Sequence, residues 1–323
     1  MLAVDVLQTE TELADEFVAA VESRYLPEKF FYWFPLSVKA WLDLCRGQQP
    51  YKNYSRSREL VQRVAKTLPA AWPGDPPSEV ISLGAGQGDK DMLILQSLTN
   101  GKGRQPLLYR PVDSSLPLLE LAVQHALQQG VASRGLKADV ASDVTAAFLS
   151  EGTRKSPPQL WLILGNSLGI IRPEKFLGVL SSLMRAEDRL LVDGEIYDRE
   201  STLAGYENPV NRRFAFAPLA SIGLEEGRDG ALVFEQQADT RIPGLQMVTK
   251  YFQAARRLEL RLAGRQMALE AREKIEMNCS YKYSLKCFLG LLRNTGKFQI
   301  LREELSADGR FAMVLAAPEK AAR

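Results

Sequence analysis

Three glycines at alternate positions, Gly84, Gly86 and Gly88, follow a short strand-like run, residues 79–83, and precede a helical pattern. Because glycine has no Cβ, the chain can turn sharply there and bring bare backbone close to a ligand at the end of a strand. Any tight turn can use glycine, so the loop alone is weak evidence for a site. Its place between strand and helix nevertheless predicts a cofactor site around Gly84, Ala85 and Gly86.

An acidic residue, Asp113, ends the next strand-like run, residues 106–112. A carboxylate at that point can accept hydrogen bonds from both ribose hydroxyls of an adenosine. A dinucleotide-binding loop would have its third glycine at position 89, where this chain has Asp89, whose charge would oppose a pyrophosphate. Loop and acid together therefore favour a cofactor that contains adenosine without phosphates, as S-adenosylmethionine does.

The histidine and cysteine residues of the chain do not favour nucleophilic catalysis or a metal site. The single histidine, His125, lies in a helical pattern and is expected to be a partly exposed helix residue, so no Ser-His-Asp set is predicted. The three cysteines, Cys45, Cys279 and Cys287, are an odd number without metal-ligand spacing. We therefore expect no metal site and no disulfide framework, and a reducing compartment.

The composition limits which class of protein this is and which kind of partner it binds. The chain has 323 residues, 46% of them hydrophobic, and its 41 basic and 39 acidic residues leave a net charge of +2. Such a chain can bury a sizeable core but has no global field to hold a polyanion, so a small-molecule substrate is favoured over nucleic acid. No secretion signal and no run of roughly 20 apolar residues is present, so we expect a soluble, cytoplasmic protein of undetermined subunit number.

The elements that must position these residues alternate along the middle of the chain. Strand-like runs separated by helical patterns predict a mostly parallel, doubly wound sheet with helices on both faces. The predicted strands are residues 79–83, 106–112, 159–164 and 189–192, and the predicted helices are residues 89–98, 116–129 and 173–184.

Three flanking segments depart from this alternation. Residues 11–68 have helical spacing and lead into a proline-rich connector, 68–77. After residue 197, the stretch 231–262 has the period-two character of antiparallel strands. An apolar helix, 284–292, then precedes two strands, 298–301 and 311–316, whose linking Asp308-Gly309 is a turn signal. We therefore predict a terminal antiparallel hairpin on a Rossmann-like sheet.

Four blocks of sequence resemble, in order, the SAM-dependent histidine Nα-methyltransferases of the ergothioneine pathway. A lysine two positions after the glycine loop, a Pro-Val-Asp-Ser strand end and a Leu-Gly-x-Ser-x-Gly strand end form a fairly specific combination. The blocks are ISLGAGQGDK at 81–90, YRPVDSS at 109–115, LGNSLG at 164–169 followed by RPE at 172–174, and SYKY at 280–283. The chain resembles a divergent member of that family.

The resemblance implies a methyltransferase that uses S-adenosylmethionine and releases S-adenosylhomocysteine. It implies that the glycine loop approaches the cofactor's amino acid part, that Lys90 contacts its carboxylate and that Asp113 holds the ribose. It also implies that Asp139 and Val140 read the adenine edge. The cofactor-binding residues so implied are Gly84, Ala85, Gly86, Lys90, Asp113, Asp139, Val140, Asn166 and Ser167.

The resemblance also implies an α+β substrate domain built from residues 1–70 and an insertion, 198–283, beside a cofactor domain of residues 78–197 and 284–323. The acceptor surfaces would come from residues 32–54, 206 and 278–283. Tyr54, Tyr206 and Ser280 match substrate residues of the family, and Tyr206 and Asn166 are the catalytic candidates. A sulfonium methyl group is already activated, so the acceptor amine needs chiefly to be neutral and aligned, and a tyrosine or water could take its proton.

Two positions depart from the family. The acidic residue before the serine is Asn278 here, and an amide cannot offer a charge to an imidazole N–H. The asparagine that handles the substrate's backbone groups is Ile170 here, which leaves Arg212 and Arg213 as candidates to bind a carboxylate. We therefore expect N-methylation of an amino acid or amino-acid-like molecule other than histidine. Methylation of an oxygen or carbon acceptor, or a catalytically silent SAM-binding protein, stays open.

Overall fold

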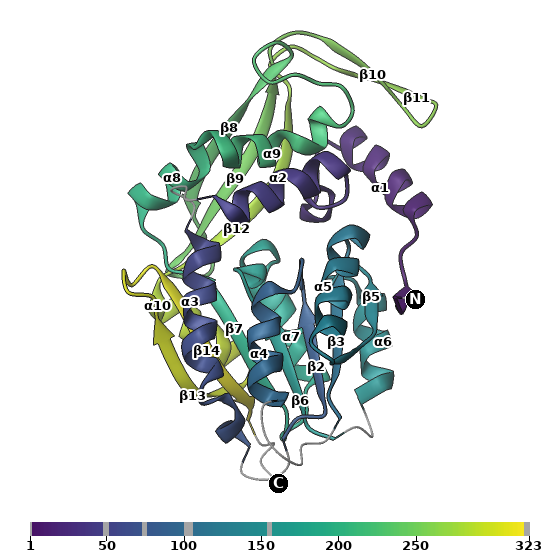
Figure 1. The fold of residues 1–323 in the computed structure, drawn as a ribbon. Helices are drawn as coiled ribbons and strands as arrows, with labels where there is room; N and C mark the ends of the chain where they lie inside the picture. The colour runs from purple at the N-terminus through teal and green to yellow at the C-terminus, as the bar shows by residue number, and fades with distance from the viewer. Residues whose placement is uncertain (1, 48–51, 73–75, 100–105, 154–156, 320–323) are drawn as a thin grey trace.

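The computed structural model of the 323-residue chain describes residues 2–47, 52–72, 76–99, 106–153 and 157–319. A nine-stranded sheet forms its lower lobe, in the order β1-β5-β3-β2-β6-β7-β14-β13, with β4 paired to β3 (Figure 1). Its strands are β1 Val4–Val6, β2 Glu79–Leu83, β3 Leu108–Asp113, β4 Ala132–Ser133, β5 Gly135–Lys137, β6 Gln159–Ile163, β7 Arg189–Glu195, β13 Phe298–Leu305 and β14 Phe311–Pro318. The predicted doubly wound sheet and its terminal hairpin are confirmed, since only β14 and β13 run antiparallel to their neighbours.

Both faces of this sheet are covered by helices, because successive residues of a strand point to opposite sides. Val80 packs under α3, α4 and α5, whereas its neighbour Ile81 packs toward α6, α7 and α10. The helices are α3 Asn53–Ala65, α4 Asp89–Thr99, α5 Leu116–Gln128, α6 Asp143–Thr153, α7 Pro173–Leu183 and α10 Leu285–Gly290, which continues into a π-helical turn, Leu291–Thr295.

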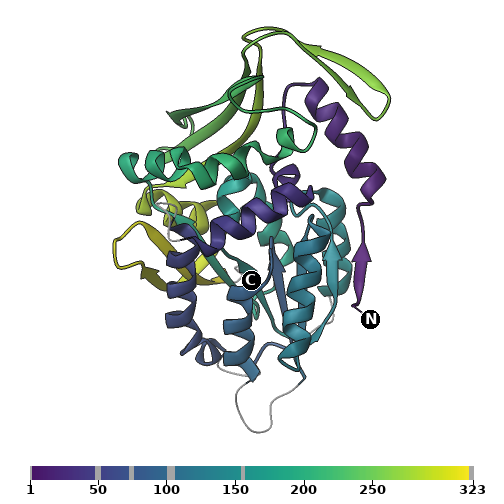
Figure 2. The same ribbon diagram turned by 45° about the horizontal axis from the view of Figure 1, so that its top comes forward.

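A second lobe lies across the top of the sheet lobe (Figures 1 and 2). A separate hydrophobic cluster holds it together, with side chains from residues 13–44 and 210–277. Its elements are α1 Glu10–Glu22, the 3-10 helix η1 Glu28–Phe31, α2 Pro35–Arg46, α8 Arg199–Glu207, α9 Pro209–Ala220, β8 Gly230–Ala238, β9 Leu245–Ala254, β10 Leu258–Leu262, β11 Arg265–Leu269 and β12 Lys274–Tyr283. Strands β8, β9 and β12 form an antiparallel sheet and β10 and β11 a hairpin.

Several elements differ from the sequence expectation. Strand β1 joins the sheet edge beside β5, although three residues are too few to give a periodic signal. Helices α8 and α9 occupy a stretch for which no element is predicted. Helix α3 packs on α4 and β14 of the sheet lobe, so a boundary at residue 70 would part it from its packing partners. Residues 73–75 of the connector and 48–51 of the predicted acceptor surface lie outside the described residues.

Within the described ranges, no helix combines the length and apolar character that crossing a membrane requires.

Candidate active site

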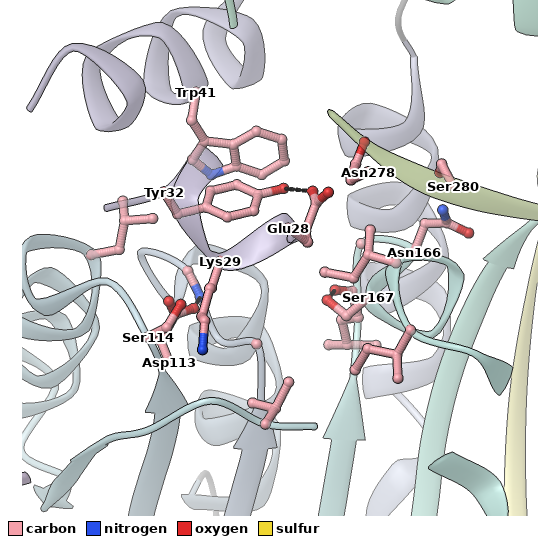
Figure 3. Close-up of a pocket in the computed structure, with 18 of the residues that line it drawn as sticks. Glu28, Lys29, Tyr32, Trp41, Asp113, Ser114, Asn166, Ser167, Asn278 and Ser280 are labelled. Atoms are coloured by element: carbon pink, nitrogen blue, oxygen red, sulfur yellow. Dashed lines mark hydrogen bonds between the residues drawn. The ribbon is translucent and has the colours of Figure 1, made fainter. Parts of the chain in front are cut away.

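A cavity of about 360 Å³ lies where the carboxyl ends of the parallel strands meet the second lobe. Its volume is within the range of small-molecule sites, and ligands of open α/β sheets bind at this edge. The residues that match cofactor or substrate positions of the family, from Gly84 to Ser280, line its wall. Figure 3 shows side chains from both lobes that point into it.

The glycine loop forms the cavity wall next to β2. Gly84, Gly86 and Gly88 have φ angles of 70°, 56° and 76°, which L side chains rarely adopt. A Cβ at Gly84 would also lie 3.0 Å from the Ser167 Oγ atom. The loop therefore needs glycine both for its backbone angles and for the close approach of the next strand end.

Asp113 lies buried at the end of β3, beside this loop. Its carboxylate accepts the backbone N–H groups of Gly86 at 2.8 Å and Ser115 at 2.9 Å. Burial raises the pKa of Asp113, and the backbone hydrogen bonds oppose that rise. Two carboxylate oxygens offer about four acceptor sites, so capacity remains for two hydroxyl donors of a ligand.

Lys90 lies in the first turn of α4, with its Nζ atom 5.5 Å from the centroid of the Tyr54 ring. A Cβ at Gly165 would lie 2.4 Å from that nitrogen, so Gly165 leaves the space that the ammonium occupies. The Tyr54 hydroxyl donates to Asp89 at 2.6 Å, and burial raises its pKa. Lys90 and Tyr54 thus present one cation and one protonated phenol to the same part of the cavity.

The Asp139 carboxylate, which follows β5, already has partners within the protein. Its Oδ2 atom is 3.1 Å from Lys29 Nζ, and its Oδ1 atom accepts the Ala141 N–H at 3.0 Å. Lys29 comes from η1 of the second lobe, so this ion pair joins the two lobes at the cavity rim. An adenine bound by Asp139 and Val140 would share the Asp139 carboxylate with Lys29.

Asn166 is held rigidly after β6. It adopts a left-handed backbone with φ 65°, its N–H donates to Asp193 at 2.7 Å, and its Oδ1 atom accepts the Glu195 N–H at 2.9 Å. Its Nδ2 atom takes part in none of these bonds and is therefore available to a ligand. The next residue, Ser167, donates its hydroxyl to the carbonyl of Leu164 at 2.9 Å, which leaves its oxygen as an acceptor.

The end of the cavity away from the glycine loop is polar and comes mostly from the second lobe. Tyr206 is buried there, with Lys282 Nζ 5.5 Å and Lys250 Nζ 5.9 Å from its ring centroid. Lys282 donates to the Ser280 hydroxyl at 3.0 Å and forms a 2.7 Å ion pair with Glu195. Burial raises the pKa of Tyr206, so its phenol stays protonated near neutral pH.

Asn278 faces this polar end from an irregularity in β12. The pairing of β12 with β9 shifts register between Glu276 and Cys279, and Asn278 has φ 84°. A β-bulge of this kind redirects a side chain, and asparagine tolerates the left-handed backbone better than most residues. The Asn278 side chain is 3% exposed, and neither its Nδ2 nor its Oδ1 atom has a hydrogen-bond partner.

Ile170 lines the cavity, as the sequence predicts, and is a partly buried apolar residue. The prediction for two arginines is wrong. Arg212 and Arg213, the candidates for a carboxylate, do not reach the cavity: Arg212 pairs with Glu226 and Arg213 is exposed. Both arginines lie on α9, where the helix period points them away from the wall that Asn211 and Phe214 form.

The comparison with protein families decides the class of this site. The profile of one family, described as histidine-specific methyltransferase, SAM-dependent, matches residues 11–318. The chain belongs to that family. The enzyme is therefore a methyltransferase with S-adenosylmethionine as its cofactor, as the sequence resemblance implies. A search of curated protein sequences gives no match.

Several solved structures are similar to the enzyme at low identity. A methyltransferase of Clostridium acetobutylicum ATCC 824 is 13% identical over 83% of this chain and 92% of its own, with a TM-score of 0.44. The 1,6-didemethyltoxoflavin-N1-methyltransferase of Burkholderia thailandensis, solved with 1,6-didemethyltoxoflavin and S-adenosylhomocysteine, is 13% identical over 98% and 94%, with a TM-score of 0.45. A protein of Pyrococcus horikoshii OT3 is 11% identical over 88% and 100%, with a TM-score of 0.47.

Several wall residues of the enzyme are not predicted from its sequence. Glu28 and Lys250 bring charges to the polar end. Trp41, which lies within the predicted segment 32–54, is instead placed against the glycine loop, 4.0 Å from where a Gly86 Cβ would be. Lys250 carries a usable signal, since a lysine that interrupts an otherwise half-buried strand is unusual. Glu28 carries none, because an acid before a helical pattern is most simply an N-terminal helix residue. His125 is a partly buried helix residue, as predicted, with its Nδ1 atom 2.9 Å from the Gln87 carbonyl.

Proposed function

We propose that the enzyme methylates a nitrogen atom of an amino acid or amino-acid-like small molecule other than histidine. One observation supports the exclusion of histidine: the buried, unpartnered side chain that faces the acceptor end from β12 is the amide of Asn278. An amide offers one neutral acceptor and one donor group, so it suits a neutral polar group better than a charged imidazole.

The residues present fit the cofactor. A loop whose glycines cannot carry a Cβ, and a buried carboxylate with unused acceptor capacity, suit an adenosine without phosphates. We propose that Gly84, Ala85 and Gly86 approach its amino acid part, that Asp113 accepts from the ribose and that Lys90 binds the carboxylate. Asp139 and Val140 would then contact the adenine, and Ser167 would lie beside the methyl group.

The catalytic task left to the protein is positioning. S-adenosylmethionine supplies an already electrophilic methyl carbon, so a neutral nitrogen aligned at roughly 3 Å suffices. We propose that Asn166 Nδ2 and the Tyr206 hydroxyl orient the acceptor. The raised pKa of Tyr206 makes it a hydrogen-bond donor rather than a proton acceptor, so water would take the amine proton.

A second candidate is histidine methylation, which one specific observation favours. The Glu28 carboxylate points toward Asn278 from η1 (Figure 3), with its Oε2 atom buried and without a partner. It could supply to an imidazole the charge that position 278 lacks. Histidine and other amino acids must therefore be compared directly.

The setting of the reaction is also part of the proposal. The concave site and the net charge of +2 favour a small-molecule acceptor over nucleic acid. A cytoplasmic location suits the three cysteines, which are unpaired in the structure.

The test is turnover with S-adenosylmethionine and a panel of acceptors: the twenty common amino acids, their decarboxylated amines, and phenols. We expect methylation of an amino acid nitrogen, located by NMR of the product, with histidine among the slower acceptors. Methylation only at oxygen or carbon would contradict the proposal, and efficient histidine turnover would replace it by the second candidate. Binding of S-adenosylhomocysteine without turnover of any acceptor would contradict both.

A further inference from the structure

The polar end of the cavity contains three side chains whose bonding capacity the described part of the protein leaves wholly or partly unused. They are Glu28 of η1, Lys250 of β9 and Asn278 of β12, and all three line the cavity. A buried polar group without a partner is destabilising, so an arrangement of three points to a ligand that satisfies them.

Glu28 reaches this place through the pairing of its segment with β12. Tyr25 forms a parallel bridge with Glu276, and Leu26 donates its N–H to the Glu276 carbonyl at 2.7 Å. The Tyr32 hydroxyl donates to Glu28 Oε1 at 3.1 Å and orients the carboxylate, whose Oε2 atom is buried without a partner. In Figure 3 this carboxylate points into the space in front of Asn278.

Lys250 lies on the neighbouring strand, opposite the bulge that contains Asn278. The adjacent pairs are Thr249 with Cys279 and Tyr251 with Glu276. Lys250 is 4% exposed, and its Nζ atom lies over two rings, 4.7 Å from the Phe31 centroid and 5.9 Å from that of Tyr206. No carboxylate of the described residues comes within the 4.0 Å of an ion pair.

Lys282 shows what a satisfied lysine looks like in the same wall. It has the Glu195 carboxylate at 2.7 Å and the Ser280 hydroxyl at 3.0 Å, although it is as deeply buried as Lys250. Buried charges are normally paired. The difference between the two lysines therefore singles out Lys250 as the one that lacks an anion.

We propose that Glu28, Asn278 and Lys250 bind the two opposite charges of a zwitterionic acceptor. On binding, the carboxylate of Glu28 receives a cationic N–H group, the ammonium of Lys250 receives a carboxylate, and the Asn278 amide donates to one and accepts from the other. If the nitrogen held by Glu28 is the one that is methylated, it first loses a proton to water and then accepts the methyl group as a neutral amine. This inference rests on the proposed function and names the side chains that hold the two charges of its acceptor.

The same three groups discriminate against molecules with a single charge. A simple amine is attracted to Glu28 but repelled by Lys250, and a simple carboxylic acid meets the reverse. Because both protein charges lie in a site of low dielectric, the unpaired one is costly to leave without a partner. An amino acid leaves neither unpaired.

The test is calorimetry with S-adenosylhomocysteine present and the twenty common amino acids as probes. The tightest binder is then compared with its decarboxylated amine and its deaminated acid, on wild type, Glu28→Gln and Lys250→Met. We expect each variant to weaken the amino acid by about tenfold to a hundredfold, the range for one charge-assisted hydrogen bond. Lys250→Met removes the charge that repels the amine and should strengthen amine binding, and Glu28→Gln should likewise strengthen binding of the acid.

Matched controls are Glu120→Gln on α5 and Lys175→Met on α7, both exposed, which should change nothing. A variant that is merely misfolded would lose S-adenosylhomocysteine and all three probes alike, and Glu28→Asp or Lys250→Gln would then replace it. Unchanged amino acid affinity in both charge variants would overturn the inference. An enzyme that N-methylates simple amines but binds no amino acid would also overturn the inference, while the proposed N-methylation would stand. An enzyme that binds amino acids but methylates only oxygen would contradict the proposed N-methylation, while the inference would stand.

Discussion

Lys282 and Glu195 form an ion pair of 2.7 Å that joins β12 of the second lobe to β7 of the sheet. Both side chains are buried, at 2% and 8% exposure. Their remaining capacity is used as well, since Asn53 Nδ2 donates to Glu195 at 2.5 Å and Lys282 donates to Ser280. The pair thus holds the two lobes together at the wall of the acceptor site.

Removing one partner of this pair should destabilise the enzyme strongly. Glu195→Ala leaves the Lys282 charge buried alone, and we expect the free energy of unfolding to fall by about 3–5 kcal/mol. The double variant Glu195→Gln with Lys282→Met should lose clearly less of its free energy of unfolding, because no buried charge remains unpaired. Urea unfolding of both, beside the exposed control Glu120→Ala, measures the difference. Equal losses in the single and double variants would show that the pair is not electrostatically coupled.

Asp113→Ala should weaken S-adenosylhomocysteine binding by roughly 1.5–3 kcal/mol, because charged hydrogen bonds to the ribose are lost. Part of the loss would come from the glycine loop, since Gly86 N–H also loses its acceptor. Asp113→Asn keeps a neutral oxygen in place, so its affinity for S-adenosylhomocysteine should lie between those of Asp113→Ala and wild type. Calorimetry at one pH compares them, and unchanged affinity in Asp113→Ala would remove this residue from the site.

Asn278→Glu should raise histidine turnover if position 278 sets the specificity. One charged hydrogen bond limits the gain to roughly 1.5–3 kcal/mol, or about tenfold to a hundredfold. The left-handed backbone of Asn278, φ 84°, would reduce this gain in histidine turnover, since that conformation costs glutamate about 1 kcal/mol more than asparagine. The double variant Ile170→Asn with Asn278→Glu also restores an amide for the substrate's backbone groups.

Methyl transfer to histidine by wild type and both variants, under identical conditions, is the measurement. Efficient turnover by the wild type would show that the interpretation of Asn278 is wrong and that Glu28 serves histidine instead. The assignment to the methyltransferase family would stand.

The affinity for a zwitterionic ligand should fall at both acidic and alkaline pH. Burial raises the pKa of Glu28, against the charges of Lys250 and Lys282 and the Tyr32 hydrogen bond, so Glu28 becomes neutral at a higher pH than an ordinary glutamate. Burial lowers the pKa of Lys250, helped by Lys282 and opposed by Glu28 and Cys279. Affinity should therefore fall on acidification as Glu28 is protonated, and fall at alkaline pH as Lys250 loses its charge.

A trimethylated derivative of the best amino acid is the probe for this profile, because its cation does not titrate. It has no N–H to donate, so its affinity reports the charges of Glu28 and Lys250 alone. Glu28→Gln should abolish the acid limb and Lys250→Met the alkaline limb. A flat profile in the wild type, measured by calorimetry with S-adenosylhomocysteine present, would contradict the assignment of these two groups.

The cofactor half of the site could be predicted because its residues are local in sequence. Gly84 to Lys90 follow one strand and Asp113 ends the next, and parallel strands bring such ends to one edge of the sheet. The strands and helices of the sheet follow from periodicity in the same way, within one to three residues at most ends. Short elements such as β1 and irregular ones such as the bulge at Asn278 leave no periodic signal.

The acceptor half depended on contacts between segments far apart in the chain. Glu28 and Asn278 meet because Tyr25 and Leu26 pair with Glu276, about 250 residues away, and no local pattern encodes that pairing. By itself the sequence determined the family and the cofactor and predicted side chains that line the cavity at the sheet edge, since backbone angles and strand order act over a few residues. Only the tertiary structure decided which charges remain unpaired in the acceptor site, because whether a buried charge has a partner depends on every element packed around it.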